Sequence, residues 1–342
     1  MAQCITKALS DPTPIKTQNS LMPFFTLLLL GVTISTSAFA GVKSYYDRFT
    51  LSFSVENHNY DLTFKVKDLE NERNPVSYKP NTRVLSGLQA TYKWLTLFYK
   101  TSAEFTEESI AEKGKTSYED LRGAIFLGRK DQFFLLGYYN RYKGFYINNT
   151  SDIDPSWSTG DPYLQREDIE TFNTGVGLLY ILDPNDFSGA AAFLQSARQT
   201  SSGGSWLFMA SFDGAKINAE QALIPAAVQS QFGADATVQD IEFVTLTGSV
   251  GYGYSLIGGN FFLTAVALVG WGNQRKKYTI GTESVNNTGT TTKNTWGLST
   301  GYNGDQFFIG LSLVNDTNNF STRTLTISNS LSSNRIFMGT RF

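Results

Sequence analysis

The segment whose spacing could perform nucleophilic catalysis is Gly297-Leu298-Ser299-Thr300-Gly301, which matches the G-x-S-x-G pattern of serine hydrolases. That pattern places a serine on a sharp turn between a strand and a helix, with a histidine base beside it. Here the serine lies within an alternating run that predicts a strand, and the only histidine, His58, is far away in sequence. We therefore interpret Ser299 as an ordinary small residue of a strand.

Histidine and cysteine each occur once, as His58 and Cys4. Cys/His zinc sites, haem ligation and iron–sulfur clusters therefore lack ligands, and an intramolecular disulfide is excluded. His58 stands between Asn57 and Asn59, a setting typical of a polar turn. We expect no catalytic residue, no cofactor and no metal.

Two charged segments could bind ions from solution. Asp152, Asp154 and Asp161 could gather around calcium, but their spacing matches no calcium loop, so a solvated acidic loop is favoured. The run Arg275-Lys276-Lys277 could meet lipopolysaccharide phosphates if it lies outside, or it could be a solvated charge run. A net charge of −2 without a long basic block argues against nucleic-acid binding.

The elements that carry these residues are strands, because apolar residues recur at every second position. Phe49, Leu51 and Phe53 alternate with polar residues, and the pattern resumes at Tyr60 after Asn57-His58-Asn59, so we expect a β-hairpin that turns at 57–59. The predicted strands are 49–56, 60–66, 84–92, 95–100, 121–128, 133–141, 173–182, 189–198, 205–212, 244–254, 261–271, 296–302, 307–313 and 335–342. Most are near the ~9–11 residues that cross a bilayer at a tilt.

The predicted connections differ in length. Short turns are expected near 129–131, 183–186 and 303–304, and long polar connections at 142–167, 213–238, 272–291 and 317–332. Short periplasmic turns and long outer loops are typical of outer-membrane barrels. Two strands fall between the turn at 183 and the loop at 213, where one or three would fit, so at least one strand is miscounted. The run 219–231 could form a short helix that folds inward as a plug.

Exposure to lipid is indicated by the stretch 243–274, which contains no charged residue. Its glycine-rich centre favours a hairpin over a helix, and a charge at bilayer depth would be costly. Aromatic residues such as Trp94 and Trp271 stand at predicted strand ends, where an interfacial belt would place them. The sequence predicts an all-β fold, an antiparallel transmembrane β-barrel of about 12 to 14 strands with long extracellular loops.

The N-terminus has the features of an export signal. A short apolar run at 24–34 precedes Ala38-Phe39-Ala40, which has small residues at the two positions that signal peptidase reads. The run is shorter than the ~20 residues of a transmembrane helix. We therefore predict a signal peptide over 1–40, cleaved before Gly41, and a barrel domain over 41–342 in the outer membrane of a Gram-negative bacterium.

Several charged residues fall opposite the larger apolar sets of their strands, where an internal polar network would lie. Arg198, like Arg141 and Lys143, would be expensive facing lipid and is expected in the lumen or at the interface. These cations could pair with Glu242, Asp120 or another carboxylate as an internal plug, which is common in narrow barrels, or could line a solute path. The candidate lumen network comprises Arg83, Lys93, Arg122, Arg198 and Glu242.

The chain ends on an alternating strand whose last residue is aromatic. Such a residue is expected in a strand that the barrel-insertion machinery reads. We therefore assign Phe342 as the assembly signal.

Several segments resemble an uncharacterised family of bacterial outer-membrane β-barrels, known only as a domain of unknown function and found largely in Bacteroidetes-type bacteria. The resemblance spans most of the mature chain and rests on Tyr78-Lys79-Pro80-Asn81, Tyr92-Lys93-Trp94-Leu95, Arg141-Tyr142-Lys143-Gly144-Phe145-Tyr146, Phe187-Ser188 and the terminal Arg341-Phe342. It implies a fold and a location, but it supplies no activity and no catalytic residue.

The sequence thus favours an outer-membrane barrel of unresolved role, narrow or plugged, for small-solute passage or envelope structure. Its expected partners are outer-membrane lipid, lipopolysaccharide, the barrel-insertion machinery and a small solute. An outer-membrane lipid-modifying hydrolase and a secreted soluble β protein are the alternatives.

Overall fold

The computed structural model describes residues 41–342 apart from 68–74, 83, 103–105, 129–130 and 282. The predicted signal peptide over 1–40 lies outside the described residues. In the part of the chain that is described, no helix is long and apolar enough to cross a membrane.

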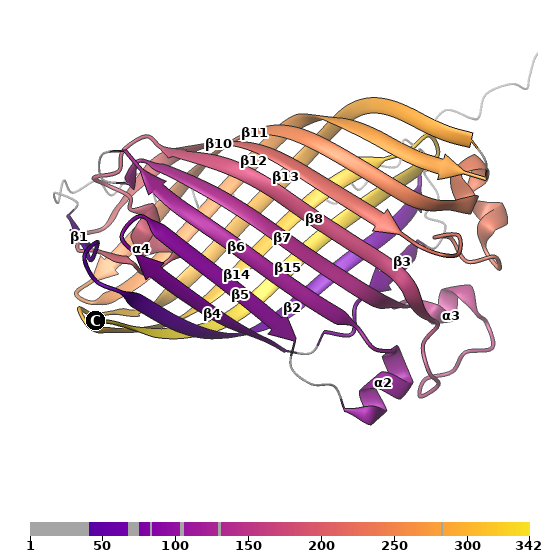
Figure 1. The fold of residues 1–342 in the computed structure, drawn as a ribbon, viewed down its shortest axis with the longest axis horizontal. Coiled ribbons are helices and arrows are strands. Elements are labelled where there is room, and N and C mark those ends of the chain that lie inside the picture. Colours follow the sequence, from indigo (N-terminus) through magenta and orange to yellow (C-terminus); the bar gives the residue numbers. More distant parts are fainter. Residues whose placement is uncertain (1–40, 68–74, 83, 103–105, 129–130, 282) are drawn as a thin grey trace, which may run out of the picture. The chain divides into compact units, whose positions relative to one another are not determined.

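Twelve antiparallel strands close into a barrel (Figure 1). Their order around the wall is β2 (Thr50–Val66), β4 (Leu85–Tyr92), β5 (Leu95–Ser102), β6 (Ser117–Leu127), β7 (Phe133–Ile147), β8 (Gln165–Ile181), β10 (Gly203–Asn218), β11 (Val238–Gly258), β12 (Phe261–Ile280), β13 (Glu283–Asn303), β14 (Phe307–Ser321) and β15 (Leu325–Arg341). The last strand pairs with the first along its whole length, from Arg341↔Thr50 to Leu325↔Val66. The predicted fold class is confirmed, and the strand count lies at the lower end of the predicted range.

A thirteenth strand, β3 (Val76–Lys79), changes the wall at one end of the barrel. It pairs with β2 at residues 62–64 and with β7 at residues 146–147. At this level β3 stands in the place that β4, β5 and β6 occupy further along the axis. A separate pair, β1 (Val42–Ser44) and β9 (Ala197–Gln199), lies at the opposite end (Figure 1).

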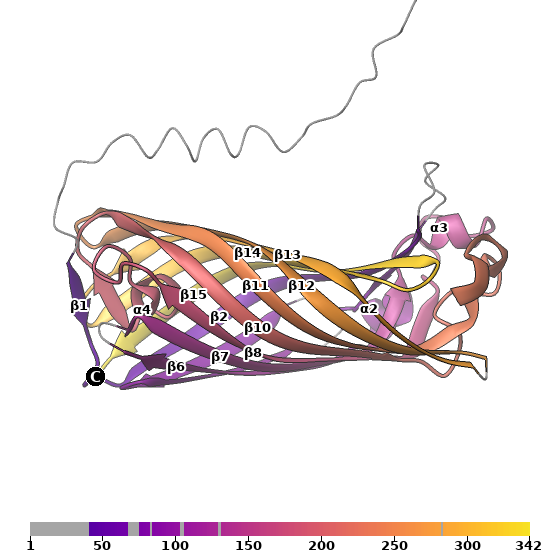
Figure 2. The ribbon, with the colours of Figure 1, turned by 90° about the horizontal axis from the view of Figure 1, so that it is seen from above.

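The two ends of the barrel differ in their connections. The C-terminus, β1 and the helix α4 (Gly189–Phe193) lie at one end, and α2 (Glu107–Lys113) and α3 (Thr150–Ile153) lie at the other (Figures 1 and 2). Longer outer connections and shorter periplasmic ones are usual in such barrels. We therefore call the end with α2 and α3 the outer end, and the end with the C-terminus the inner end.

The predicted hairpin over 49–66 is wrong, because these residues form one continuous strand, β2. Near the inner end, Phe53 and Val55 face outward and are exposed, while Ser52 and Ser54 are buried. Past His58 the apolar residues Tyr60, Leu62 and Phe64 occupy the buried, inward parity instead. The apolar parity switches because the surroundings change along the strand, from lipid outside and a polar lumen inside to water outside and an apolar core inside.

The same change of surroundings explains two further corrections. The long polar connections predicted at 272–291 and 317–332 are mostly strand, since β12 continues to Ile280, β13 begins at Glu283 and β15 begins at Leu325. The predicted strand at 189–198 is not part of the wall, because it contains α4 and the start of β9. One merged pair and one misplaced strand account for the difference between fourteen predicted strands and twelve.

An apolar band on the outer face marks the bilayer. On β12 the outward residues are apolar from Phe261 to Trp271, and beyond that they are Asn273, Arg275 and Lys277. The band covers residues 261–271, which matches the ~9–11 residues of a tilted membrane strand. The outer ends of the long strands therefore extend past the membrane.

Candidate functional site

A buried carboxylate organises the lumen at bilayer depth. Glu56 on β2 is 3% exposed, and its Oε2 accepts a hydrogen bond of 2.6 Å from the Lys100 ammonium of β5. Its Oε1 lies 3.2 Å from His58 Nε2 and accepts a hydrogen bond from the Ser333 hydroxyl of β15. Three strands thus supply partners to one carboxylate. A buried charge needs such partners because it has lost the hydrogen bonds of water.

A second carboxylate lies on the neighbouring strand β6. Asp120 is 1% exposed and accepts hydrogen bonds from the Arg122 guanidinium and from the Tyr118 hydroxyl, each at 2.7 Å. Because Asp120 and Arg122 are two residues apart, both project to the same side of the strand. We call Glu56, His58, Lys100, Tyr118, Asp120, Arg122 and Ser333 the lumen network.

His58 belongs to this network, so its interpretation as a polar turn residue is wrong. It is 4% exposed in the middle of β2, and its Nδ1 lies 3.4 Å from the Tyr142 hydroxyl of β7. Tyr142 in turn stacks on Tyr60 at 4.6 Å between ring centroids. His58 therefore stands where the polar lumen meets the apolar core of the outer end.

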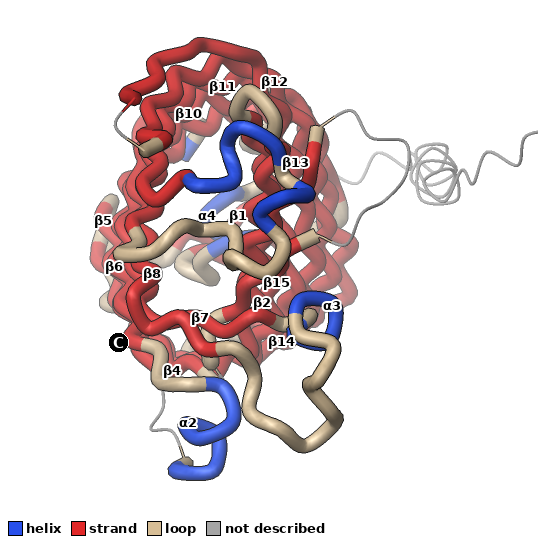
Figure 3. The backbone as a smooth tube through the Cα atoms, turned by 90° about the vertical axis from the view of Figure 1, so that its right-hand side faces the viewer, coloured by secondary structure: helices blue, strands red, loops and turns tan. Residues whose placement is uncertain are grey.

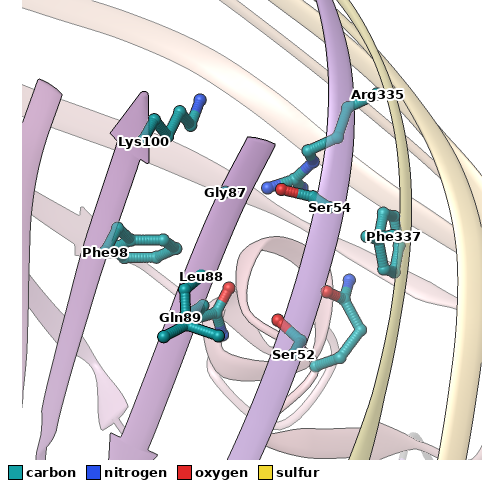
Figure 4. Close-up of a pocket in the computed structure, with 10 residues that line it drawn as sticks. Ser52, Ser54, Gly87, Leu88, Gln89, Phe98, Lys100, Arg335 and Phe337 are labelled. Atoms are coloured by element: carbon teal, nitrogen blue, oxygen red, sulfur yellow. The ribbon is translucent and has the colours of Figure 1, made fainter. Parts of the chain in front are cut away.

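A small cavity lies between the lumen network and the inner end (Figure 4). Its volume is about 10 Å³, which is about the space of a single water molecule. Lys100 and Arg335 line it together with Ser54 and Gln89, and in Figure 4 the Arg335 side chain reaches toward Ser54. The inner surface here is polar, but the cavity itself leaves no space for a solute larger than water.

The outer end is filled by residues 219–237, which we call the outer cap. Leu223, Ile224, Val228 and Phe232 of the cap are buried in one apolar core with side chains of the barrel wall. The wall contributes Leu62, Phe64, Tyr78, Ile169, Phe243, Tyr278, Leu325 and Ile327. Figure 3, which looks at this end, shows short helical and loop segments crossing the opening of the barrel.

Polar contacts hold the outer cap to the wall on two sides. Arg166 of β8 donates to the Ala222 carbonyl at 2.9 Å, and Asp168 accepts from the backbone N–H of Glu220 at 3.1 Å. On the other side Asp235 accepts from the Thr322 hydroxyl, at 2.6 Å, between β14 and β15. Because both apolar packing and hydrogen bonds attach the cap to the wall, the cap is an ordered part of the outer end.

The inner end is filled by residues 187–199, which we call the inner plug and which include α4 and β9. Ser188 begins α4 as its N-cap, since its hydroxyl accepts from the Ala191 N–H at 3.2 Å. Phe187 and Leu194 are buried in a second apolar cluster with Leu179 and Leu207 of the wall. This packing explains why an apolar segment at 189–198 lies inside the barrel and not in its wall.

Arg341, the last residue of β15, holds the inner plug from the centre of the inner end. It is 3% exposed, its Nε donates to the Gln195 carbonyl at 3.1 Å, and its Nη2 donates to Asn303 Oδ1 at 2.6 Å. Its guanidinium also lies 4.2 Å from the Tyr45 ring centroid and 4.7 Å from that of Phe308. The penultimate residue of the chain therefore joins the closing strand to the plug.

The N-terminal segment of the barrel domain is held at the same end by Asp305. Its carboxylate accepts from the Tyr45 hydroxyl at 2.7 Å and lies 2.8 Å from the Lys43 ammonium. The contacts with Lys43 and Tyr45 lower the pKa of Asp305 to about 2. Burial, together with the hydrogen bond to Asp305, raises the pKa of Tyr45 to about 12.

Of the five residues that the sequence predicts in the lumen, Arg122 belongs to the lumen network around Glu56 and Asp120. Arg83 lies outside the described residues. Arg198 lies in β9 and contacts Asn260 at 2.7 Å and Asp305 at 3.2 Å, so it belongs to the inner plug. The terminal Phe342 is 72% exposed and donates its N–H to the Phe49 carbonyl at 2.9 Å.

Lys93 and Glu242 do not lie in the lumen, in contrast to the expectation. Lys93 is exposed in the turn between β4 and β5, with its ammonium 5.3 Å from the Tyr92 ring centroid. Glu242 is exposed on the outward parity of β11, between buried Ile241 and Phe243. Both positions are compatible with a charge because one lies in a turn and the other lies above the apolar band.

Arg141 and Lys143 of β7 also face outward, beyond the apolar band. Arg141 pairs with Glu170 of β8 across the strand junction, and Lys143 is exposed. Of the two places expected for these residues, the lumen and the interface, the structure excludes the lumen, and Arg141 pairs with Glu170 and not with Asp120. A charge is tolerated on this outward face because it lies beyond the apolar band.

The other chemical motifs do not assemble into sites. Ser299 lies inside β13, and its hydroxyl has no hydrogen-bond partner in the described structure. Asp154 accepts hydrogen bonds from Ser156, which lower the pKa of its carboxyl. Among the described residues, no group of three or more His, Cys, Asp or Glu residues could hold a metal ion.

Sequence reasoning missed the two central residues, Glu56 and Lys100. Glu56 shares the parity of Ser52 and Ser54, so the alternation of β2 could have predicted that its side chain points inward. Its ion pair with Lys100 could not be predicted from the sequence, because it depends on which strands become neighbours in the sheet. β5 is separated from β2 by β4, so the pair reaches across an intervening strand.

Solved structures with a similar arrangement are membrane proteins of different stated activities. The outer membrane protease OmpT from Escherichia coli is 8% identical, with a TM-score of 0.40 over 90% of this chain and 100% of that chain. The beta domain of the Bordetella autotransporter BrkA is 11% identical, with a TM-score of 0.35 over 87% and 99%. The P. putida toluene transporter TodX is 8% identical, with a TM-score of 0.29 over 86% and 90%. At these values the likeness carries no inference about activity.

No curated protein sequence matches the chain. A family model does match, and it covers residues 39–342, the whole of the barrel domain. The resemblance noted from the sequence is confirmed by this match. The chain belongs to the family described as Domain of unknown function (DUF4421).

Proposed function

We propose that the protein is an outer-membrane barrel that is closed to solutes as folded, and that it serves small-solute passage through displacement of a plug, or envelope structure. The observation that supports this is the filling of both ends by the chain itself, with the outer cap at one end and the inner plug at the other. Barrels with open aqueous channels typically have about 16 to 18 strands, and narrower ones are filled. A wall of twelve strands supports a narrow, filled barrel.

Planar-bilayer recording with purified protein tests the proposal. We expect little or no steady conductance from the full barrel, and a large, stable, weakly selective conductance would overturn the closed state. Because β10 ends at Asn218 and β11 begins at Val238, residues 220–236 can be replaced by a short linker without cutting either strand. Channels that appear only in that variant favour solute passage. Because the inner plug still fills the other end, a variant that stays closed is recorded again with Arg341→Met added, and a double variant that also stays closed favours a role in envelope structure.

We further propose that the chain reaches the outer membrane through cleavage before Gly41, and that the insertion machinery reads Phe342. The family match begins at residue 39, close to the proposed mature start, which supports a barrel domain preceded by a removable segment. Outer-membrane lipid and lipopolysaccharide are then its surroundings. Fractionation of the envelope separates this proposal from a secreted soluble protein.

We propose that the protein is not an enzyme. The alternative, a lipid-modifying hydrolase, would need Ser299 and His58 to act together. The partners of His58 are Glu56 and Tyr142, and Ser299 lies in the middle of a strand with no turn at its position. A lipase assay on the Ser299→Ala and His58→Ala variants tests this, and loss of a measured activity in either variant would reverse it.

A further inference from the structure

A hollow of about 490 Å³ lies on the outer face of the barrel over strands β10 to β13. The cross-strand register aligns its residues in rows. One row contains Phe212, Leu246, Asn273 and Thr290, and the next row toward the outer end contains Gly214, Val244, Arg275 and Thr288. Phe212, whose ring is 53% exposed, lines the hollow on the β10 side.

The hollow spans the edge of the bilayer. Trp271, 62% exposed, is the last apolar outward residue of β12, and Arg275 stands two outward positions above it. Exposed tryptophan is typical of the membrane interface. At ~3.4 Å per residue, Arg275 lies about 7 Å along the strand above the row of Phe212 and Leu246. The β10 and β11 side of the hollow, with Phe212 and Leu246, therefore meets acyl chains, and the β12 and β13 side, with Arg275 and Thr288, meets headgroups.

The outward face above the hollow is positively charged. The next row contains Lys216, Glu242 and Lys277, so with Arg275 these four outward residues sum to +2. Among the described residues, Arg275 forms no ion pair. Lys276 does not contribute, because it points inward and donates to the Ser321 hydroxyl at 3.1 Å. A cation without a carboxylate partner at headgroup depth is complementary to a phosphate.

We propose that this hollow binds a phosphorylated lipid of the outer leaflet. Arg275 would contact the headgroup phosphate, Thr288 and Thr290 would offer hydroxyls beside it, and an acyl chain would lie over Phe212 and Leu246. A guanidinium suits this role because its donors match phosphate oxygens in a bidentate manner. The inference rests on the proposed outer-membrane location, but it does not depend on whether the barrel conducts.

Native mass spectrometry of the folded, full-length mature barrel tests the site, with diphosphorylated lipid A as the probe. Arg275→Gln should weaken binding about tenfold, as expected for loss of a charge-assisted hydrogen bond. Thr290→Trp should also weaken binding, because it fills the hollow while the charge of Arg275 is retained. Lys143→Gln, which removes an exposed outward cation on β7, is the matched control and should bind as the parent does.

Three comparisons make the outcomes distinct. Dephosphorylated lipid A should bind the parent and Arg275→Gln equally, and free inorganic phosphate should not displace the lipid at millimolar concentration. Unchanged binding in Arg275→Gln, or an equal loss in Lys143→Gln, would overturn the site and leave only general surface charge. Heat-modifiable migration of each variant verifies that the barrel is folded. A conducting barrel that still binds lipid A at Arg275 would refute the closed state and not the lipid site.

Discussion

Replacing Arg341 with methionine should release the inner plug while leaving the barrel wall intact. The side chain is buried, and its guanidinium donates to the Gln195 carbonyl and to Asn303 Oδ1. Methionine fills much of the same volume but donates no hydrogen bond, so the Gln195 carbonyl and Asn303 Oδ1 lose their donor. The Gly304 carbonyl, the third acceptor of Arg341, keeps the Tyr45 hydroxyl at 3.4 Å. An unsatisfied buried acceptor costs ~1–3 kcal/mol, and we take about 3 kcal/mol for the two together.

That free energy predicts a measurable increase in the fraction of molecules in which the inner plug is open. Since 1.4 kcal/mol corresponds to a factor of ten, ~3 kcal/mol raises the open population of the plug by about a hundredfold. Hydrogen exchange measured by mass spectrometry on peptides from 187–199 should report this change. Peptides from β11 and β12 should exchange as in the parent, because their ladders do not include Arg341.

The control is Arg48→Met, which removes an exposed arginine of the same end whose Nη1 donates to the Asp305 carbonyl at 3.1 Å. It should leave exchange of the plug unchanged. If Arg341→Met leaves the plug as protected as in the parent, the plug is held by its apolar packing alone. If exchange increases equally in the wall, the variant has destabilised the whole barrel, and the assignment of a local role to Arg341 is wrong.

Four further outcomes are expected. N-terminal analysis of protein from the envelope should find Gly41 as the first residue, and a start more than a few residues away would contradict the predicted cleavage. Deletion of Phe342, or Phe342→Asp, should lower the amount of heat-modifiable barrel in the membrane, and normal assembly of both variants would contradict its role in insertion. The pKa of Asp305 is lowered to about 2, so the ionised carboxylate favours the folded state above the ordinary carboxyl pKa; protection of the β1 amides should fall as the pH drops from about 4 through 2. Glu56→Ala should lower the free energy of unfolding by about 3–5 kcal/mol by leaving Lys100 buried and unpaired, and Lys100→Met in the same chain should restore most of it, as chemical denaturation in detergent would measure.

The fold was largely predictable because lipid on one side and a lumen on the other impose a strict two-residue alternation. β12 illustrates this, since its outward residues from Phe261 to Trp271 are all apolar. The prediction failed where the barrel leaves the membrane. In β2 the apolar parity inverts past His58 without any break in the strand, and a pattern that assumes one environment interprets such an inversion as a turn.

The candidate site was less predictable because the direction in which a side chain points and its depth relative to the bilayer are set independently. Alternation correctly gives the inward parity of Arg122, but it says nothing about how far a residue lies from the bilayer. Glu242 is outward and charged without penalty because it lies above the apolar band, which only the register with Lys277 reveals. Partners such as Glu56 and Lys100 depend on three-dimensional neighbours that no local pattern encodes.

The strand β3 gives the two ends of the barrel different girths. At its level the wall runs from β2 through β3 directly to β7, so the ring there contains ten strands in place of twelve. Diameter grows roughly in proportion to strand number, so the outer ring encloses roughly 30% less cross-sectional area than the inner one. The narrower outer ring is filled by the longer segment, the outer cap over residues 219–237 with its two 3-10 helices. The wider inner ring is filled by the shorter inner plug over residues 187–199, with the helix α4, together with the buried side chain of Arg341. The barrel therefore narrows from its inner end to its outer end, and a different segment of the chain closes each end.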